Sequence, residues 1–596
     1  MIKTSYSLAN TTKKKHESSQ LKRMLFLYRY FRKYGGLLLL SLVLLLLTSL
    51  ASIGLLYFFK VLIDDNLAKG DYSGLISTVI GIGVVSVLRS VTSYGRIHVV
   101  GLIGQKALFE LRKDIFDHLQ ELPLQFFTEN KSGDIIARVT NDVEYVNRFL
   151  SEGFIQLLEV FFNLIAVGIV VFLLDIALTQ LAFVGVIFLV VFLFVQGTFL
   201  RKSTRRSLDE NGSLSSSIQE MLGGFRVMKG FAQEGLIAER FIEVNARYKK
   251  ASLLQASIDA LSSPGLELIT RLSILSILIV GVQRVIGGVM TLGILVSYWA
   301  YIYQFFQQVT SLSSISSNIQ SGLAATARIQ ELLAMQTNIF TSGDPYLPKY
   351  EEIKGKVEFD HVHFSYEDGV EVLSDVAMLA KPGKKIAVVG PTGGGKTSFV
   401  GLIARLYDVD KGLVLIDDVD VREWDLETIR YAVSYVLQDT FLFADTIVNN
   451  LRYGKPDATL EEMEGVLRLL GVWDFIDALP EKLETVLEQN GENLSLGQRQ
   501  MLSIARTFLS DPKIVVLDEA TANIDTRSEQ MIIQAMDTLM QGRTSFVIAH
   551  RLSTVENADH IVFIHESRIL EQGSHEELMS RDGKFSEMYR KYREAG

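Results

Sequence analysis

The sequence has 596 residues, enough for several domains, with a formal net charge of −9 and 48% hydrophobic residues. The mild acidity says little about partners, but nothing in the sequence resembles a basic stripe that would bind nucleic acid. Because the chain has no cysteine, disulfides, thiolate zinc sites and a cysteine nucleophile are excluded. This composition suits a bacterial protein that faces the cytoplasm, although an engineered cysteine-free chain would look the same.

The N-terminal residues 1–23 are polar and include three consecutive lysines at 13–15. The apolar run that follows is too long for the core of a signal peptide, so we expect a disordered cytoplasmic tail over 1–23. Segment 24–34 (MLFLYRYFRKY) interleaves aromatic and basic residues. That pattern predicts an interfacial helix on the inner leaflet of a membrane.

Six apolar segments are each long enough to cross the roughly 30 Å hydrocarbon core of a bilayer as a helix. Short loops join the first to the second, the third to the fourth and the fifth to the sixth. Long polar connections, such as 105–122, separate the second segment from the third and the fourth from the fifth. Their sequences are typical of helices, so they predict membrane helices that continue out of the bilayer. The six predicted spans are 36–59, 75–97, 154–174, 177–200, 264–286 and 292–313.

Basic residues decide the predicted orientation, because they gather on the cytoplasmic side of membrane proteins. They precede the first span and follow the fourth, whereas the loop after the first span is acidic. We therefore expect both termini and both long connections in the cytoplasm, with a transmembrane domain over 24–335. The basic residues concerned are Lys22, Arg23, Arg29, Arg32 and Lys33, and Arg201, Lys202, Arg205 and Arg206.

Charged and aromatic residues inside the spans allow two interpretations each. Glu267 and Arg271 are four residues apart and can pair on one helix, and Glu159 can either pair or bind cationic substrates. The aromatic residues of 297–308 (SYWAYIYQFFQQ) fit interface anchoring and helix packing as well as a substrate cavity.

A linker over 336–354 contains Pro345 and Pro348 and precedes a soluble-type domain over 355–596. There the strand-like KIAVVG (385–390) runs into GPTGGGKT, which matches the P-loop pattern in its strand–loop–helix setting. Backbone N–H groups of such a loop surround phosphate at a helix N-terminus. We expect Lys396 to reach the β- and γ-phosphates and Thr397 to ligate Mg²⁺. The predicted phosphate-binding residues are Gly390, Pro391, Thr392, Gly393, Gly394, Gly395, Lys396, Thr397 and Ser398.

Two carboxylates end the buried-type strand IVVLDE (514–519). Asp518 is placed to hold Mg²⁺ through water, and Glu519 can polarise the attacking water. The motifs LSLGQRQ (494–500) and SFVIAH (545–550) flank this strand.

With these motifs in this order, residues from about 355 onward resemble the nucleotide-binding domain of ABC transporters. The whole chain beyond its tail resembles bacterial half-size ABC exporters of the multidrug class. The resemblance implies an all-α six-helix transmembrane exporter domain plus an α/β P-loop NTPase cassette that hydrolyses MgATP. It also implies export of hydrophobic compounds, with cationic ones among the candidates, by alternating access across a bacterial cell membrane. The implied partners are the lipid bilayer and a second half-transporter subunit, and nucleic acid is not among them.

The resemblance also assigns roles outside the P-loop. Tyr366 looks like the aromatic that stacks on adenine, and Gln438 looks like the glutamine that contacts Mg²⁺ and the attacking water. His550 looks like the switch histidine, and segments 126–144 and 223–234 look like the loops that hold the coupling helices. The residues that resemble the signature and D-loop groups acting on ATP of the other subunit are Ser495, Gly497, Gln498 and Asp525.

Two departures from the family pattern favour a heterodimer over a homodimer. Leu496 replaces the first signature glycine, and Asn523 and Ile524 replace the commoner D-loop residues. A lipid flippase and a peptide exporter of the same fold stay open as alternatives. A non-transporting ABC ATPase has no need of six spans, and an inactive structural cassette would not need Lys396 and Glu519.

Overall fold

The computed structural model describes residues 20–336, 339, 343–366, 370–436, 440–518, 526–549 and 551–595. These residues form two compact units, each described separately here. The membrane unit holds the described residues from 20 to 119 together with 133–334. The C-terminal unit holds the residues from 335 onward together with 120–132. A short piece of the first long connection therefore folds with the C-terminal unit.

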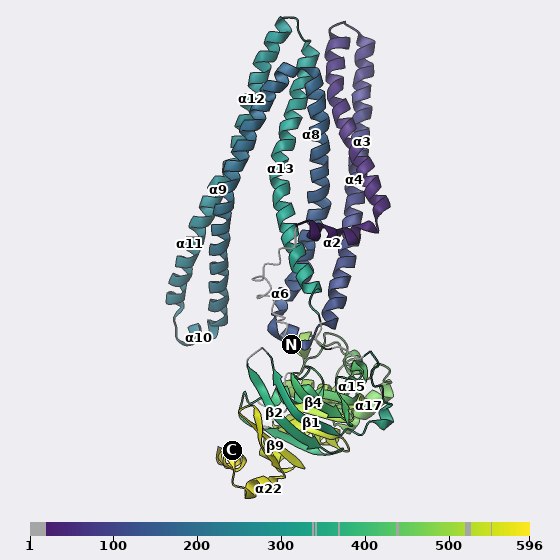
Figure 1. Ribbon diagram of the computed structural model, residues 1–596, viewed down its shortest axis with the longest axis vertical. Coiled ribbons are helices and arrows are strands. Elements are labelled where there is room, and N and C mark those ends of the chain that lie inside the picture. The colour runs from purple at the N-terminus through teal and green to yellow at the C-terminus, as the bar shows by residue number, and fades with distance from the viewer. Residues whose placement is uncertain are drawn as a thin grey trace. The chain divides into compact units, whose positions relative to one another are not determined.

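Long helices build the membrane unit (Figure 1). They are α2 (Gln20–Arg32), α3 (Gly35–Lys60), α4 (Tyr72–Glu121), α8 (Ile155–Leu174), α9 (Ile176–Gly223), α11 (Glu234–Ala260), α12 (Ser262–Ile286) and α13 (Leu292–Leu333). Shorter elements are α6 (Ser132–Ala137), α7 (Val143–Arg148), α10 (Phe225–Gly230) and π-helical turns at Val61–Leu67, Arg138–Asp142 and Phe149–Phe154. The predicted interfacial helix at 24–34 lies within and just after α2, and α4 and α9 continue their spans into the predicted connections.

Five helical stretches among the described residues are long and apolar enough to cross a membrane. The sixth predicted span, 292–313, is helical as part of α13 but is not among them, because its Tyr, Trp and Gln side chains dilute its apolar residues. This span is therefore helical as predicted but less apolar than the other five. The five stretches are Gly35–Leu67, Tyr72–Glu121, Ser132–Leu174, Ile176–Gly223 and Glu234–Ile286.

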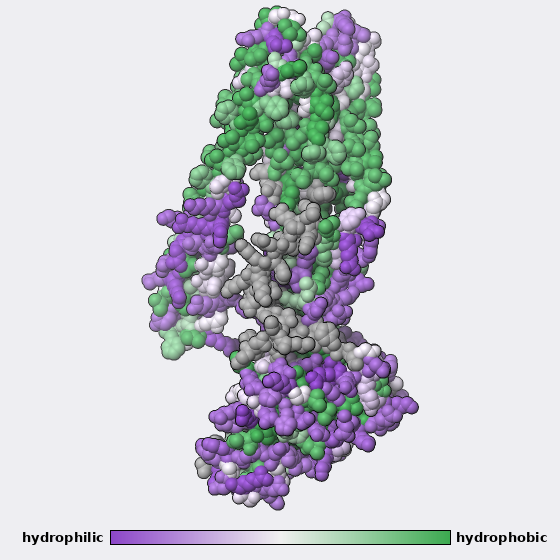
Figure 2. All heavy atoms as spheres, in the orientation of Figure 1, coloured by the Kyte–Doolittle hydropathy of each residue, from purple (hydrophilic) through white to green (hydrophobic). Residues whose placement is uncertain are grey.

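Within the membrane unit, α13 packs against α3 and α8, while α9 packs against α11 and α12. The helices α9, α11 and α12 form an arm, and the short helix α10 lies at its tip between α9 and α11 (Figure 1). Apolar side chains cover the visible surface of the upper part of this unit, and hydrophilic ones cover the lower part of the arm (Figure 2). This division fits spans that continue as helices beyond the bilayer.

Ion pairs inside the spans confirm the pairing interpretation of the sequence. Arg271 Nε donates to Glu267 Oε1 at 2.9 Å, and Glu159 lies 2.8 Å from Arg96, which ends the second predicted span. An unpaired charge at the centre of a span costs about 2.5–3.5 kcal/mol on insertion scales, so a partner reduces that cost. Arg96 could have been predicted as the partner of Glu159, because it carries the opposite charge and lies in the neighbouring span. The sequence analysis did not use this signal.

Two sheets form the frame of the C-terminal unit. The first has the order β2-β1-β4-β5 with antiparallel neighbours, and the second has the order β10-β9-β3-β8-β7-β6. In the second sheet β9, β3, β8, β7 and β6 are parallel, and only β10 is antiparallel. The strands are β1 (Val357–Ser365), β2 (Glu371–Ala380), β3 (Lys385–Val389), β4 (Lys411–Ile416), β5 (Val419–Asp420), β6 (Val433–Val436), β7 (Ile514–Asp518), β8 (Thr544–Ile548), β9 (His560–His565) and β10 (Arg568–Gly573).

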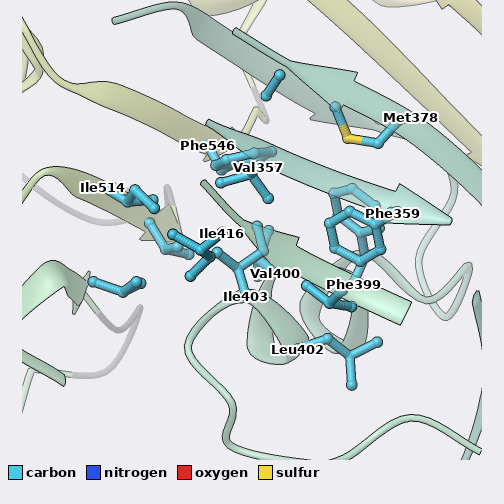
Figure 3. Close-up of a cluster of buried hydrophobic side chains, with 14 of the residues drawn as sticks. Val357, Phe359, Met378, Phe399, Val400, Leu402, Ile403, Ile416, Ile514 and Phe546 are labelled. Carbon is cyan, nitrogen blue, oxygen red and sulfur yellow. The ribbon is translucent and has the colours of Figure 1, made fainter. Parts of the chain in front are cut away.

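Helix α14 (Lys396–Ile403) lies between the two sheets of this unit and fills its main core. Phe399 stacks on Phe359 of β1 with ring centroids 4.3 Å apart, and Phe546 of β8 contacts the same ring (Figure 3). A second core surrounds α17 (Leu460–Leu469) and α19 (Leu496–Leu509). The P-loop helix and the signature helix are therefore anchored in separate cores.

Candidate functional site

The P-loop connects β3 to α14 through backbone conformations that require glycine. Gly390, Gly393 and Gly395 have φ values of 149°, 80° and 96°. A Cβ on Gly395 would lie 2.8 Å from the carbonyl oxygen of Val372, and one on Gly390 would collide with the carbonyl oxygen of Ile564. The loop can therefore turn its amides inward only with these glycines, as phosphate binding demands.

Lys396, the first residue of α14, lies folded into this loop. Its Nζ donates to the carbonyl oxygens of Gly390 and Pro391, both at 2.9 Å. Burial lowers the pKa of the ammonium, and the nearby Asp518 carboxylate opposes that shift. A buried cation on the backbone of a glycine-rich loop creates a site for a polyanion.

Oxygen ligands suited to Mg²⁺ lie at the same edge of the sheet. Because β3, β8 and β7 are parallel neighbours, their carboxyl ends meet there. Asp518 ends β7, and Thr397 is exposed in the first turn of α14. A hydroxyl and a carboxylate beside a phosphate loop fit Mg²⁺, which takes few protein ligands and completes its shell with phosphates and water.

Four predicted site residues, Gln438, Glu519, Asp525 and His550, lie outside the described residues. Glu519 directly follows β7, and β8 ends two positions before His550. Their roles stay predictions.

Tyr366, the predicted adenine-stacking residue, lies beside the P-loop helix. Its hydroxyl shares a 2.8 Å hydrogen bond with Ser398 of α14. Its ring makes edge contacts with Phe364 and Tyr407, with centroids 5.0 and 5.2 Å away. Burial raises the pKa of Tyr407 to about 12. Aromatic side chains thus gather next to the phosphate loop.

The short helix α5 (Leu124–Glu129), from the first long connection, contacts this aromatic group. Gln125 Nε2 donates to the carbonyl oxygen of Tyr366 at 2.9 Å, and Thr128 lies close enough to Tyr407 to oppose the rise in its pKa. The sequence analysis identified 126–144 as a coupling segment but missed Gln125 and Tyr407. No motif marks Tyr407, so only the fold could reveal its position beside Tyr366.

The signature residues form the N-terminus of α19. Ser495 caps the helix, its Oγ accepting from the Gln498 backbone N–H at 3.2 Å, and Gln498 Oε1 accepts from the Ser495 N–H at 2.9 Å. Gly497 is buried, and Leu496, the first helical residue, is half-buried. Leucine at this position therefore leaves the capping box and the helix start intact.

Comparison with known families decides the identity of this architecture. Residues 38–309 match the family model for the ABC transporter transmembrane region, and residues 373–522 match that for the ABC transporter cassette. A fatty acid ABC transporter ATP-binding/permease protein of Mycobacterium bovis is 35% identical over 83% of this chain and 78% of its own length. The chain belongs to the half-size ABC exporters.

Other relatives of this exporter cover nearly its full length. A protein named ATP-dependent lipid A-core flippase, from Syntrophus aciditrophicus, is 33% identical over 92% of this chain and 91% of its own. A putative multidrug export ATP-binding/permease protein of Bacillus subtilis is 34% identical over 89% and 92%. The ATP-bound structure of a bacterial Atm1-family ABC exporter superposes with a TM-score of 0.77 at 27% identity, covering 94% of this chain and 98% of that one. The exporter is thus an ATP-hydrolysing transporter of the membrane, and ABC exporters act as dimers.

Cysteines can test the α5 contact in this cysteine-free exporter. A Thr128→Cys/Tyr407→Cys pair is expected to form an oxidative crosslink, because the two native side chains lie close together. Mild oxidation, proteolysis in the linker and gel analysis would show the two fragments held together. A Thr140→Cys/Tyr407→Cys pair serves as the control and should stay open. Failure of the first pair to crosslink with and without ATP would contradict the contact.

The second coupling segment provides a companion experiment at Phe225, the first residue of α10. We expect a cysteine there, labelled with a thiol-reactive photocrosslinker, to crosslink to a cassette as well. Tagged and untagged subunits distinguish the chain's own cassette from that of its partner. If no crosslink to either cassette forms in any nucleotide state, the predicted topology is wrong.

Proposed function

We propose that this exporter moves hydrophobic compounds, with cationic ones among them, out of a bacterial cell across its cytoplasmic membrane. Both termini and the cassette lie in the cytoplasm in this proposal, as the charge bias of the loops favours. The observation that carries it is the pairing, in one chain, of apolar spanning helices with a glycine-dependent P-loop that encloses Lys396.

Each predicted site residue has a task in this proposal. Lys396 binds the β- and γ-phosphates with the loop residues 390–398, and Tyr366 stacks on adenine. Thr397, Asp518 and Gln438 hold Mg²⁺, which neutralises phosphate charge when it is bound. Glu519 takes the proton of the attacking water, and His550 contacts the γ-phosphate.

The remaining residues act across the dimer. Ser495, Gly497 and Gln498, with Asp525, bind the ATP held by the P-loop of the other cassette. The anchoring of α14 and α19 in separate cores supports this arrangement, because each helix can then present its N-terminus to a different nucleotide. ATP binding closes the two cassettes head to tail, and hydrolysis reopens them and alternates the access of the cavity.

We further propose that the natural partner is a different half-transporter. Leu496 adds an isobutyl group at the start of α19, where a glycine would leave space for phosphate. The signature of this chain then completes a weaker site on the partner's P-loop. The site built on Lys396 and Glu519 would use the partner's signature and carry out most hydrolysis.

Expression of the chain alone and with the half-transporter encoded beside it tests this asymmetry. We expect the chain alone to be a poor ATPase and co-expression to raise drug-stimulated turnover at least about tenfold, a difference of 1.4 kcal/mol in barrier. Leu496→Gly should raise the turnover of the homodimer. Full turnover by the purified homodimer, unimproved by the neighbour, would reject the heterodimer.

A lipid flippase is the second candidate. A hollow of about 700 Å³, lined almost wholly by apolar side chains, lies between α2, α3, α4 and the start of α8. Acyl chains fit such a lining, and one relative is named a flippase. Transport of a fluorescent phospholipid, measured beside that of hydrophobic cations in the same vesicles, distinguishes the two functions.

A further inference from the structure

Among the hollows in the described membrane unit, one is lined very differently from the apolar one beside α2. It has a volume of about 660 Å³ and lies between α12 and α13, where charged, polar and aromatic side chains line it together. We call it the α12–α13 site. Its distinguishing residues are Glu267, Thr270, Arg271, Trp299, Tyr303 and Gln307.

The ion pair of Glu267 and Arg271 forms the α12 wall of this site. Both side chains are accessible, with 56% and 73% of their surfaces exposed. An exposed pair four residues apart stabilises a helix only slightly, far less than two charges within a span cost. Helix stability alone therefore gives little reason for the pair, whereas a polar ligand or water in the hollow would solvate both charges.

The α13 wall presents Trp299, Tyr303 and Gln307, spaced four residues apart and hence on one face. Trp299 and Tyr303 are 44% and 49% exposed, so their ring faces are available to a ligand. Aromatic faces attract ammonium groups, and the Gln307 amide can donate and accept hydrogen bonds. The exposed aromatic residues thus complement the charges opposite them.

We propose that the α12–α13 site binds an amphiphile whose head group carries both a cation and an anion. The ammonium would lie between Glu267 and the aromatic rings, and the anion would lie at Arg271. The chain of the amphiphile would lie along Leu266, Ile274 and Leu275, which supply the aliphatic part of the lining. A zwitterion satisfies both members of a neutral ion pair, whereas a singly charged ligand leaves one of them unpaired. This inference rests on the proposed export function and narrows its substrate class.

The fluorescence of Trp299 can test the site directly. The other tryptophans, Trp424 and Trp473, lie in the C-terminal unit, so Trp299 alone reports on the membrane unit. The probes are alkylphosphocholine, alkyltrimethylammonium and alkyl phosphate of equal chain length, added to the purified exporter below their micellar concentrations. We expect alkylphosphocholine to half-saturate the Trp299 signal at a concentration at least about tenfold lower than either singly charged probe. Trp299→Phe should remove the signal.

Charge variants then separate the ion pair from its surroundings. Glu267→Gln and Arg271→Gln should each weaken alkylphosphocholine binding about tenfold, and the exchanged pair Glu267→Arg/Arg271→Glu should restore most of it. The matched control is Glu243→Gln/Arg247→Gln, a pair of the same spacing on α11 outside the predicted spans, which should change nothing. The exchanged pair also keeps the test valid if a single variant misfolds.

Equal binding of all three probes, or unchanged binding in the Glu267 and Arg271 variants, would overturn the α12–α13 site. Basal ATP hydrolysis, measured without amphiphile, tests the exporter proposal separately. Its absence from the wild-type complex would count against export, while the fluorescence titration would still decide the site.

Discussion

Glu519→Gln is expected to lower ATP turnover and transport at least about a hundredfold, within the 10²–10⁴ range of a lost general base. The amide keeps the shape of the side chain but cannot accept a proton from the attacking water. Lys396, Thr397 and Asp518 are untouched, so MgATP binding and closure of the cassettes should persist. Phosphate release and nucleotide binding, both measured on the complex with its proper partner, check the two halves of this expectation.

Glu461→Gln is the matched control, because Glu461 is exposed on α17 and lies in no proposed site. It should hydrolyse ATP like the wild type. If Glu519→Gln retained more than about a tenth of wild-type turnover, Glu519 would not be the catalytic base.

Lys396→Ala is expected to act earlier, on nucleotide binding itself. The substitution removes an ammonium that lies within 2.9 Å of two loop carbonyls and is placed to bind phosphate. A hydrogen bond to a charged group contributes about 1.5–3 kcal/mol, so MgATP affinity should fall about 10- to 100-fold. Calorimetry or displacement of a fluorescent nucleotide would measure the loss.

Lys384→Ala controls for the loss of a lysine from the same unit. Its ammonium pairs with Asp559 at 2.8 Å and is exposed, so its removal should leave nucleotide affinity unchanged. An unchanged affinity in Lys396→Ala would remove the basis of the P-loop assignment.

Local sequence patterns were sufficient to predict the strands and helices that hold the nucleotide-site residues. The P-loop was found with its strand and helix because glycine spacing and the flanking lysine depend on neighbours in sequence alone. Likewise β7 ends at Asp518, as its apolar run indicates. The six membrane helices begin within a few residues of the predicted spans, because length and hydropathy indicate where they start.

Such local patterns could not predict contacts between segments that are distant in the sequence. Nothing local joins Gln125 to Tyr366, or Tyr407 to Thr128, because these pairs depend on how α5 docks. The sixth predicted span is helical but less apolar than the other five, because Tyr, Trp and Gln residues interrupt its apolar residues over 297–308. These same residues proved informative in another way, because Trp299 and Tyr303 line a hollow together with an ion pair.

The docking of α5 has a consequence for the order in which the exporter acquires its structure during synthesis. Gln125 leaves the ribosome 241 residues before its partner Tyr366. Its docking surface combines Tyr366 with Tyr407 from beyond the P-loop helix, so the surface exists only after the cassette has folded. Loop length hardly opposes this late step, since doubling a loop costs only about 0.6 kcal/mol. A mutation that slows cassette folding would thus leave a nascent chain whose membrane helices are already inserted and whose α5 is still accessible to proteases.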